Sequence, residues 1–207
     1  MKIRTFAVVA ALGAMGMASP GHAASVIDEW ASVKLPPAPA LKPVTVDPKT
    51  TALLMLDFMN QNCGKRPRCV ATVPAVKKLL AEARAKKMAV VYTLIAKTTP
   101  ADVIKDVAPA AGEPSVLSGP DKFLKTDLEK ILKDKGIQTV IAVGTSSNGA
   151  VLYTGSAAAL RGLKVIVPVD GMSSMDALTD ATTALVLTTA PRVSGQVTLT
   201  RMDLIKF

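Results

Sequence analysis

Apolar residues follow two alternating spacings from residue 51 to the C-terminus. Short runs of mostly apolar residues predict strands, and the most continuous of these runs are typical of strands buried on both faces. Strands are expected at 51–58, 88–95, 139–143, 163–169 and 196–201. Between the strands, apolar residues recur every three or four positions, which predicts amphipathic helices. Helices are expected at 72–86, 126–135, 148–160 and 175–189.

The alternation of strands and helices determines the expected topology. A strand, a helix and a further strand at this spacing are joined by right-handed crossovers, so the strands form a parallel sheet with helices on both faces. We therefore predict a three-layer α/β fold of Rossmann-like type over residues 51–207. In such sheets the ligand site lies beyond the carboxyl ends of the strands, where the strand order reverses. Asp57 and residues 144–147 emerge at that edge.

Three local signals refine the helices. Pro74 suits the first turn of the first helix, where no backbone donor is needed. Thr126 and Glu129 have the spacing of a capping box, in which each side chain accepts from the backbone amide of the other. Gly136 is a candidate for a left-handed cap at the end of the same helix.

Two segments follow neither spacing. Residues 24–50 contain prolines at five positions, which disfavour a helix, so we expect a largely extended arm. This arm wraps the domain or a neighbouring subunit of a homo-oligomer, or it is a disordered tether. Residues 97–122 form a long irregular stretch, which is either functional or contains a short strand at 115–117.

The first 23 residues have the order of a secretory signal peptide. Lys2 and Arg4 precede the apolar run 6–17, and small residues follow up to Ala23. We expect cleavage after Ala23 and export of the mature chain to the periplasm. The apolar run is too short to span a bilayer and no later stretch is long enough, so no membrane span is expected.

Composition and charge narrow the classes of function. The chain has 207 residues, of which 49% are hydrophobic and 20% charged, and this is typical of a globular protein. The formal net charge is +9, and removal of Lys2 and Arg4 lowers it to +7. Basic residues are spread along the predicted helices and only 3% of residues are aromatic. We therefore expect a solvated surface and no nucleic-acid binding, with some attraction for small anions.

The residue types available for catalysis are limited. His22 is the only histidine and lies in the predicted signal peptide, so the mature chain has none. This excludes Ser-His-Asp and Cys-His catalysis and any metal site that needs imidazole, and we expect no metal or cofactor. Cys63 and Cys69 are the only cysteines. In an oxidising compartment we expect them to form a disulfide; the alternative is one reactive thiol beside the basic residues between them.

Asp57 is the first candidate for chemistry. It ends an apolar strand, where burial raises the pKa of a carboxyl unless a cation or backbone amides hold it ionised. We interpret Asp57 as a catalytic acid or base. The alternative is a carboxylate that ties down a loop.

The second candidate is the glycine-containing segment 144–150, which joins a strand to the start of a helix. Its glycine spacing is that of a phosphate loop, but Ala150 and Val151 stand where such a loop needs Lys and Ser or Thr, which excludes nucleotide binding. The free amides of this segment, with Thr145, Ser146 and Ala150 as the candidate residues, suit an anion or a developing oxyanion. The alternative is that a serine hydroxyl here only caps the helix.

Together these segments resemble the isochorismatase-like hydrolases, a superfamily that also contains nicotinamidases and other amidases. The resemblance runs over about residues 51–170 and depends on the order and spacing of the matching segments. These segments are 51–57, 123–128, 144–154, 157–162 and 169–170. The resemblance implies a six-stranded parallel sheet with helices on both sides and a small-molecule substrate.

The usual catalytic set of this superfamily is an Asp, a Lys and a nucleophilic Cys. Asp57 matches the Asp, whereas Ala150 stands at the Cys position, so the resemblance implies an atypical member without the family nucleophile. Leu117 stands where the family has its Lys. We expect Lys122 to supply the ammonium from a neighbouring position, and the alternative is that Lys122 is a surface lysine.

True isochorismatases also lack the cysteine, and the resemblance implies that their Asp acts as an acid in vinyl ether cleavage. We therefore expect an exported hydrolase of a vinyl ether or amide type bond, in which Asp57 works with Lys122. The basic loop at Lys65, Arg66 and Arg68 favours an anionic substrate. The alternative is a catalytically inactive relative that binds a small ligand or a protein partner. A third interpretation is that one of the two cysteines is a displaced nucleophile.

Overall fold

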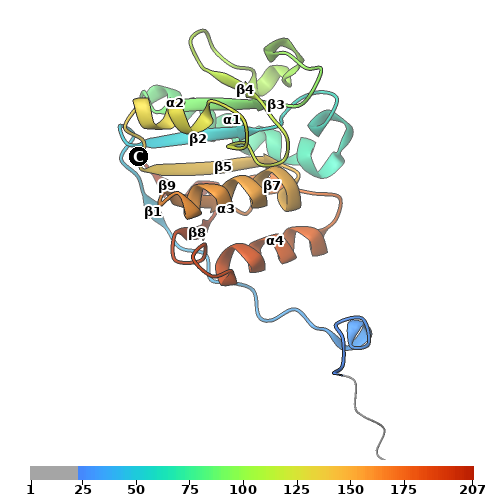
Figure 1. Cartoon of the computed structure of the whole chain (residues 1–207). Helices are drawn as coiled ribbons and strands as arrows, with labels where there is room; N and C mark the ends of the chain where they lie inside the picture. The colour runs from blue at the N-terminus through green and yellow to red at the C-terminus, as the bar shows by residue number, and fades with distance from the viewer. Residues whose placement is uncertain (1–22) are drawn as a thin grey trace, which may run out of the picture. The chain divides into compact units, whose positions relative to one another are not determined.

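Six parallel strands form the central sheet of the fold, as Figure 1 shows. The structure is a computed structural model that describes residues 23–207, so the predicted signal peptide lies outside the described residues apart from Ala23. The strands are β2 (Thr51–Leu56), β3 (Ala89–Leu94), β4 (Ser115–Leu117), β5 (Thr139–Thr145), β6 (Lys164–Pro168) and β8 (Val197–Thr200). A short seventh strand, β7 (Met172–Ser173), pairs with the end of β5. The predicted six-stranded parallel sheet is confirmed.

The order of the strands places the switch point in the middle of the sheet. The order is β4-β3-β2-β5-β6-β8, so the chain builds outward from β2 in one direction and then from β5 in the other. The carboxyl ends of β2 and β5 therefore flank the position where a ligand site is expected. Asp57 follows β2 directly, and Thr145 is the last residue of β5.

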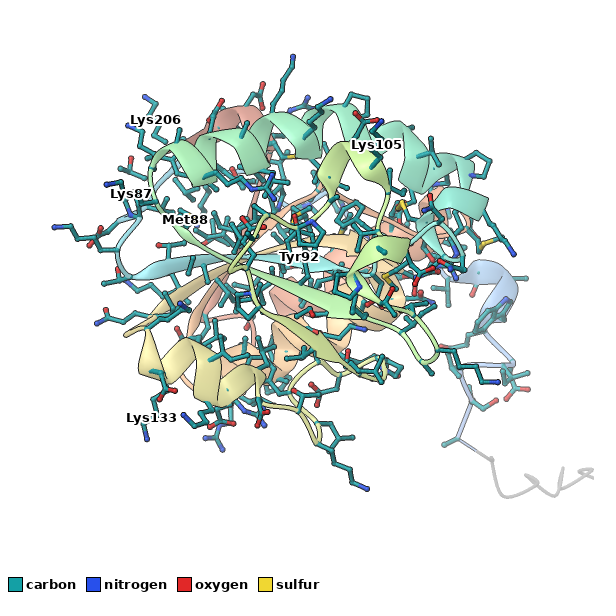
Figure 2. All side chains as sticks on the ribbon, turned by 90° about the horizontal axis from the view of Figure 1, so that it is seen from above. Lys87, Met88, Tyr92, Lys105, Lys133 and Lys206 are labelled. Carbon is teal, nitrogen blue, oxygen red and sulfur yellow. A yellow bond between two sulfur atoms is a disulfide. The ribbon has the colours of Figure 1, made fainter. Side chains whose placement is uncertain are left out.

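Helices cover both faces of this sheet. They are α1 (Pro67–Ala85), α2 (Leu128–Asp134), α3 (Leu152–Leu160) and α4 (Ala177–Thr189). Successive residues of β2 point to opposite faces. Leu53 and Met55 pack in the core cluster that includes α1, while Leu54 and Leu56 pack in the cluster that includes α2, α3 and α4. Figure 2 accordingly shows α1 and α2 on opposite sides of the sheet.

The first helix begins five residues earlier than predicted. α1 begins at Pro67, which takes the first-turn position that the sequence analysis assigned to Pro74. Pro74 lies inside the helix, so that assignment is wrong. The hydrophobic pattern alone does not show which of the two prolines lies in the first turn of the helix. Cys69 and Val73 are buried and extend the apolar face of the helix back by about one turn.

The predicted capping box does not form. The Oγ1 atom of Thr126 donates to the carbonyl oxygen of Lys122 and accepts from the amide of Leu128, the first residue of α2. The carboxylate of Glu129 binds Arg161 of the neighbouring helix region at 2.7 Å. Thr126 therefore binds the amide of Leu128 instead of that of Glu129, and Glu129 is used for a contact with another segment, which a local spacing rule does not consider.

The four lysines labelled in Figure 2 lie apart from one another at the periphery of the molecule. Lys87, Lys105, Lys133 and Lys206 are all exposed and come from different segments of the chain. Tyr92, in contrast, lies in the interior with only 1% of its surface exposed. This distribution is that of a solvated surface. Within residues 23–207, no helix combines the length and the apolar character needed to cross a membrane.

The end of the predicted arm pairs with the C-terminus. The chain divides at Pro36 into two units, and the second unit contains the rest of the arm and the sheet. In that unit β1 (Val44–Thr45) pairs in parallel with β9 (Ile205–Lys206). The backbone amides of Lys42 and Val46 donate to C-terminal carbonyls at 3.0 and 2.9 Å, and Val46 is 6% exposed. The first unit contains a one-turn 3-10 helix, η1 (Trp30–Ser32).

Two truncations should therefore differ in stability. Removal of residues 24–46 loses the burial of Val46 and two backbone hydrogen bonds, which together stabilise the fold by about 3 to 5 kcal/mol. We expect the thermal midpoint to fall by on the order of 10 °C. Removal of residues 24–36 should leave it unchanged. Calorimetry of both proteins beside the mature chain measures this, and equal midpoints for the two truncations would contradict the stabilising role of β1.

Candidate active site

Asp57 and Lys122 form a buried ion pair at the switch point. Lys122 lies in the loop between β4 and α2, and its Nζ atom is 2.6 Å from Oδ2 of Asp57. Asp57 is 5% exposed and Lys122 is fully buried at 0%. The structure thus brings the two residues of the predicted catalytic pair into direct contact. Lys122 is not a surface lysine.

Thr93 holds the Asp57 carboxylate and backbone in place. Asp57 has a φ of +60°, a left-handed conformation that few residues other than glycine adopt. The amide of Asp57 donates to Oγ1 of Thr93 at 3.2 Å, and the hydroxyl of Thr93 donates to Oδ1 of Asp57 at 2.6 Å. Thr93 belongs to β3, the strand beside β2. The neighbouring strand therefore maintains an unfavourable backbone conformation and orients the carboxylate.

The ammonium of Lys122 has two hydrogen-bond acceptors among the described residues. An ammonium has three N–H groups, and one of them binds Asp57. A second donates to the carbonyl oxygen of Gly119 at 2.8 Å. The third has no acceptor among residues 23–207. A substrate oxygen at this position would complete the hydrogen bonding of the buried ammonium.

Burial raises the pKa of the Asp57 carboxyl, because desolvation disfavours its charged form. The charge and hydrogen bond of Lys122, the Thr93 hydroxyl and the charge of Arg66 act in the opposite direction. We therefore expect Asp57 to exchange its proton at a higher pH than an exposed aspartate. This is the property required of a carboxyl that gives or takes a proton during catalysis.

Gly144 allows β5 to approach β2 beside the ion pair. Its φ is +140°, and a Cβ atom at this position would lie 2.0 Å from the carbonyl oxygen of Leu56. Leu56 is the register partner of Gly144 and immediately precedes Asp57. Any side chain at residue 144 would therefore force apart the two strands whose ends form the site.

The three predicted oxyanion residues lie at or just after the end of β5. Thr145 is buried, and its hydroxyl donates to the carbonyl oxygen of Ser173 at 3.0 Å. Ser146 is half-buried, and Ala150 is 4% exposed at the edge of the core. These residues therefore share one edge of the sheet with Asp57. Their binding of an oxyanion stays a prediction.

Neither serine of this segment caps the helix that follows. The helix begins with one π-helical turn over Ser147–Val151 and continues as α3. Ser146 makes no side-chain capping bond. Ser147 is buried, and its hydroxyl donates to Oδ1 of Asp180 at 2.7 Å. The alternative interpretation as helix caps is therefore not observed for either hydroxyl.

Cys63 and Cys69 form the predicted disulfide. They are the only cysteines of the sequence, so no free thiol remains. Both are fully buried. The interpretations that required a reactive thiol or a displaced cysteine nucleophile are therefore wrong.

The polar residues of the site do not form a metal-binding set. Within the described residues, no three His, Cys, Asp or Glu side chains gather closely enough to hold a metal ion. The carboxylate of Asp57 is already bound by Thr93 and Lys122. A cation beside the Lys122 ammonium would also be repelled. The arrangement is suited to proton transfer and to hydrogen bonding of a polar substrate.

Three parts of the site were missed in the sequence analysis. Thr93 is a polar residue in a buried apolar run, and this sequence signal could have identified it. In the structure it pairs in register with Leu56. Gly119 contributes only a backbone carbonyl, which no sequence pattern marks. Arg66 appeared only as one basic residue of a loop. Its Nη1 atom donates to Oγ1 of Thr145 at 3.1 Å, so it lies at the predicted oxyanion segment.

Comparisons with known proteins agree with this fold. The family model described as the isochorismatase domain matches residues 51–199. No curated protein matches the chain.

Several solved structures have the same fold. An isochorismatase-like hydrolase from Alkaliphilus metalliredigens is 23% identical with a TM-score of 0.68, covering 76% of this chain and 96% of that one. An N-carbamoylsarcosine amidase from Thermoplasma acidophilum is 24% identical with a TM-score of 0.64, covering 74% and 97%. A nicotinamidase from Staphylococcus aureus is 19% identical with a TM-score of 0.63, covering 74% and 99%.

The buried ion pair should show strong coupling in a double-mutant cycle. Lys122→Met leaves an unpaired buried carboxylate, and we expect it to destabilise the fold by about 3 to 5 kcal/mol. Asp57→Asn combined with Lys122→Met should cost less than the sum of the two single changes. Urea unfolding of the four proteins measures the free energies.

Lys130→Met provides the matched control. Lys130 forms an exposed pair with Asp134 in α2, and its loss should change stability by less than about 1 kcal/mol. Additive effects of Asp57→Asn and Lys122→Met would contradict a coupled pair.

Proposed function

Because the chain belongs to the isochorismatase family, we propose that it is a hydrolase of a small molecule that works through Asp57 without a cysteine nucleophile. The buried contact between Asp57 and Lys122 is the observation that carries this proposal. Burying two opposite charges is costly, and a pair kept at the switch point of an α/β sheet is suited to chemistry there. Lys122 orients the carboxyl and offers its remaining N–H group to the substrate.

The absence of a thiol limits the reaction. Both cysteines are bound in the disulfide, and Ala150 stands at the position that the family resemblance assigns to the nucleophilic cysteine. A thioester intermediate is therefore not part of the proposed mechanism. Water must therefore react without a covalent enzyme intermediate, and Asp57 must transfer the proton.

As a general acid, Asp57 suits a vinyl ether. The protonated carboxyl gives its proton to the terminal alkene carbon, and the ether oxygen stabilises the resulting carbocation. Water then adds to this cation and loses a proton, which can return to Asp57. The hemiketal breaks into an alcohol and a ketone. No covalent bond to the protein forms at any step.

As a general base, Asp57 suits an amide. The ionised carboxylate takes a proton from the water that attacks the carbonyl carbon, and later returns it to the leaving amine. The amides around Thr145, Ser146 and Ala150 would hold the oxyanion. The amidase and the nicotinamidase among the similar structures are the reason to include amides in the substrate panel.

One alternative has specific support. A catalytically inactive protein that binds a small ligand would also retain the fold and the ion pair. Ala150 and Leu117, which stand where the family resemblance places the cysteine and the lysine, favour this alternative.

We also propose that the mature chain works outside the cytoplasm. In residues 1–23, basic residues are followed by an apolar run and then by small residues, and this order supports export. The Cys63–Cys69 disulfide supports an oxidising compartment.

Turnover of isochorismate or of an amide should depend on Asp57. We expect Asp57→Asn to lower kcat by on the order of 100-fold to 10,000-fold, because it removes the transferable proton. Asp106→Asn is the matched control, since Asp106 is exposed and pairs only with Lys77, and it should leave kcat unchanged. Purified mature protein is assayed against isochorismate, nicotinamide and further amides. No turnover by the unmodified protein on the whole panel would favour the ligand-binding alternative.

The pH profile should distinguish the acid from the base. Because the pKa of Asp57 is raised, an acid mechanism keeps the active protonated form at low pH and loses it as pH rises through that pKa. The log of kcat then falls by about one unit per pH unit. A base mechanism gives the opposite pH dependence, in which kcat rises as the pH rises through the same pKa. We expect the falling limb for a vinyl ether, and a profile without any Asp57-dependent limb would contradict both mechanisms.

A further inference from the structure

We propose that Arg66 forms a carboxylate-binding subsite beside Asp57 and that the Cys63–Cys69 disulfide holds Arg66 in position. This inference rests on the proposed function, because it narrows the substrate to a small molecule that carries a carboxylate. It also assigns carboxylate binding to Arg66 and not to the other basic residues of the same loop.

The backbone of Arg66 is fixed inside the disulfide ring. Its amide donates to the carbonyl oxygen of Cys63 at 2.9 Å, and its own carbonyl accepts from the amide of Val70 at 3.0 Å. Cys69 lies three residues beyond Arg66, and the Cα atoms of the two cysteines are 5.3 Å apart. Both ends of the ring are fully buried. The loop is therefore anchored on either side of Arg66.

The side chain of Arg66 reaches the end of β5. Its Nη1 atom donates to Oγ1 of Thr145 at 3.1 Å, and Thr145 in turn donates to Ser173. This second bond fixes the direction of the threonine hydroxyl. Arg66 is half-buried, so its guanidinium has lost part of its hydration.

Three observations place the Arg66 loop and its guanidinium close to the ion pair. Asn62, at the start of the same loop, donates to the carbonyl oxygen of Asp57 at 3.3 Å. The charge of Arg66 also lowers the pKa of the Asp57 carboxyl, against the larger effect of burial. Thr145 follows Gly144, which pairs in register with Leu56 beside Asp57. A ligand held by Arg66 would thus have its reacting group near Asp57.

Arg66 lacks an anionic partner in the described part of the chain. It takes part in no salt bridge among residues 23–207, and its one side-chain acceptor is a neutral hydroxyl. Arg68 of the same loop is paired with Asp180 at 2.6 Å, and the half-buried Arg84 is paired with Glu113 at 2.8 Å. A half-buried guanidinium with free N–H groups is suited to a planar carboxylate, which accepts two parallel hydrogen bonds.

The test compares carboxylates with their neutral amides. Binding of benzoate and benzamide, and of acetate and acetamide, is measured by calorimetry on the mature protein at 150 mM salt, where long-range attraction is screened. We expect a carboxylate to bind more tightly than its amide. Arg66→Gln should weaken carboxylate binding by about tenfold or more, because a charge-assisted hydrogen bond is lost.

Lys65→Gln is the matched control. Lys65 lies in the same loop and is exposed, so it changes the net charge equally without touching the site. We expect its carboxylate affinity to stay within about twofold of the unmodified protein. Equal weakening by Lys65→Gln and Arg66→Gln would overturn the subsite and indicate general attraction. Failure of both carboxylates to bind the unmodified protein more tightly than their amides would overturn it too.

Reduction tests the role of the disulfide. After reduction is verified by thiol titration, carboxylate affinity should fall at least about threefold at a temperature where the protein stays folded. The double variant Cys63→Ala with Cys69→Ala should behave in the same way without any reductant. Unchanged affinity in both samples would overturn the positioning role.

The outcomes separate this inference from the proposed function. Arg66-dependent carboxylate binding without turnover on the panel would support the subsite and remove the hydrolase proposal. Turnover with carboxylate binding that is insensitive to Arg66→Gln would support the hydrolase and overturn the subsite.

Discussion

The contact between Lys122 and Asp57 determines the arrangement of the residues around it. Two charges removed from water are tolerated only when their remaining donors and acceptors are also satisfied. Thr93 binds the second carboxylate oxygen and Gly119 accepts from the ammonium. The backbone amide of Lys122 also donates to Thr154 of α3 at 3.4 Å. The pair thus connects two neighbouring strands, the irregular loop before α2 and the helix α3.

The close packing of β2 and β5 is the second requirement. Leu56 and Gly144 face each other in register, and only glycine leaves room for the Leu56 carbonyl oxygen. This approach brings Thr145 next to the strand that ends in Asp57. The acid, the predicted oxyanion segment and the Arg66 guanidinium therefore meet at one edge, although they are far apart in sequence.

The sequence predicts the structural features that depend on a local pattern of residues. The five longer strands of the sheet follow from apolar runs, as in β2, where every residue is buried, and Asp57 follows from its position at the end of such a run. The short strand β4 was only one of two alternatives for an irregular stretch, and β7 was not predicted. Lys122 came from the family resemblance and its neighbouring position, not from any pattern of its own. The start of α1 was misplaced because Pro67 and Pro74 are equally compatible with a first turn. Gly119 and the role of Arg66 could not be assigned because their partners lie on other strands and loops, whereas Thr93 was marked only as a polar residue in a buried apolar run.

The use of the two cysteines connects the chemistry of the site to its stability. A thiol placed in a disulfide cannot act as a nucleophile, and the proposed mechanism accordingly uses proton transfer by Asp57. The same covalent bond closes the ring from which Arg66 reaches Thr145. On the proposed mechanism the cysteines therefore contribute to recognition and not to bond cleavage. This division fits an oxidising compartment, where a disulfide persists while an exposed catalytic thiol is subject to oxidation.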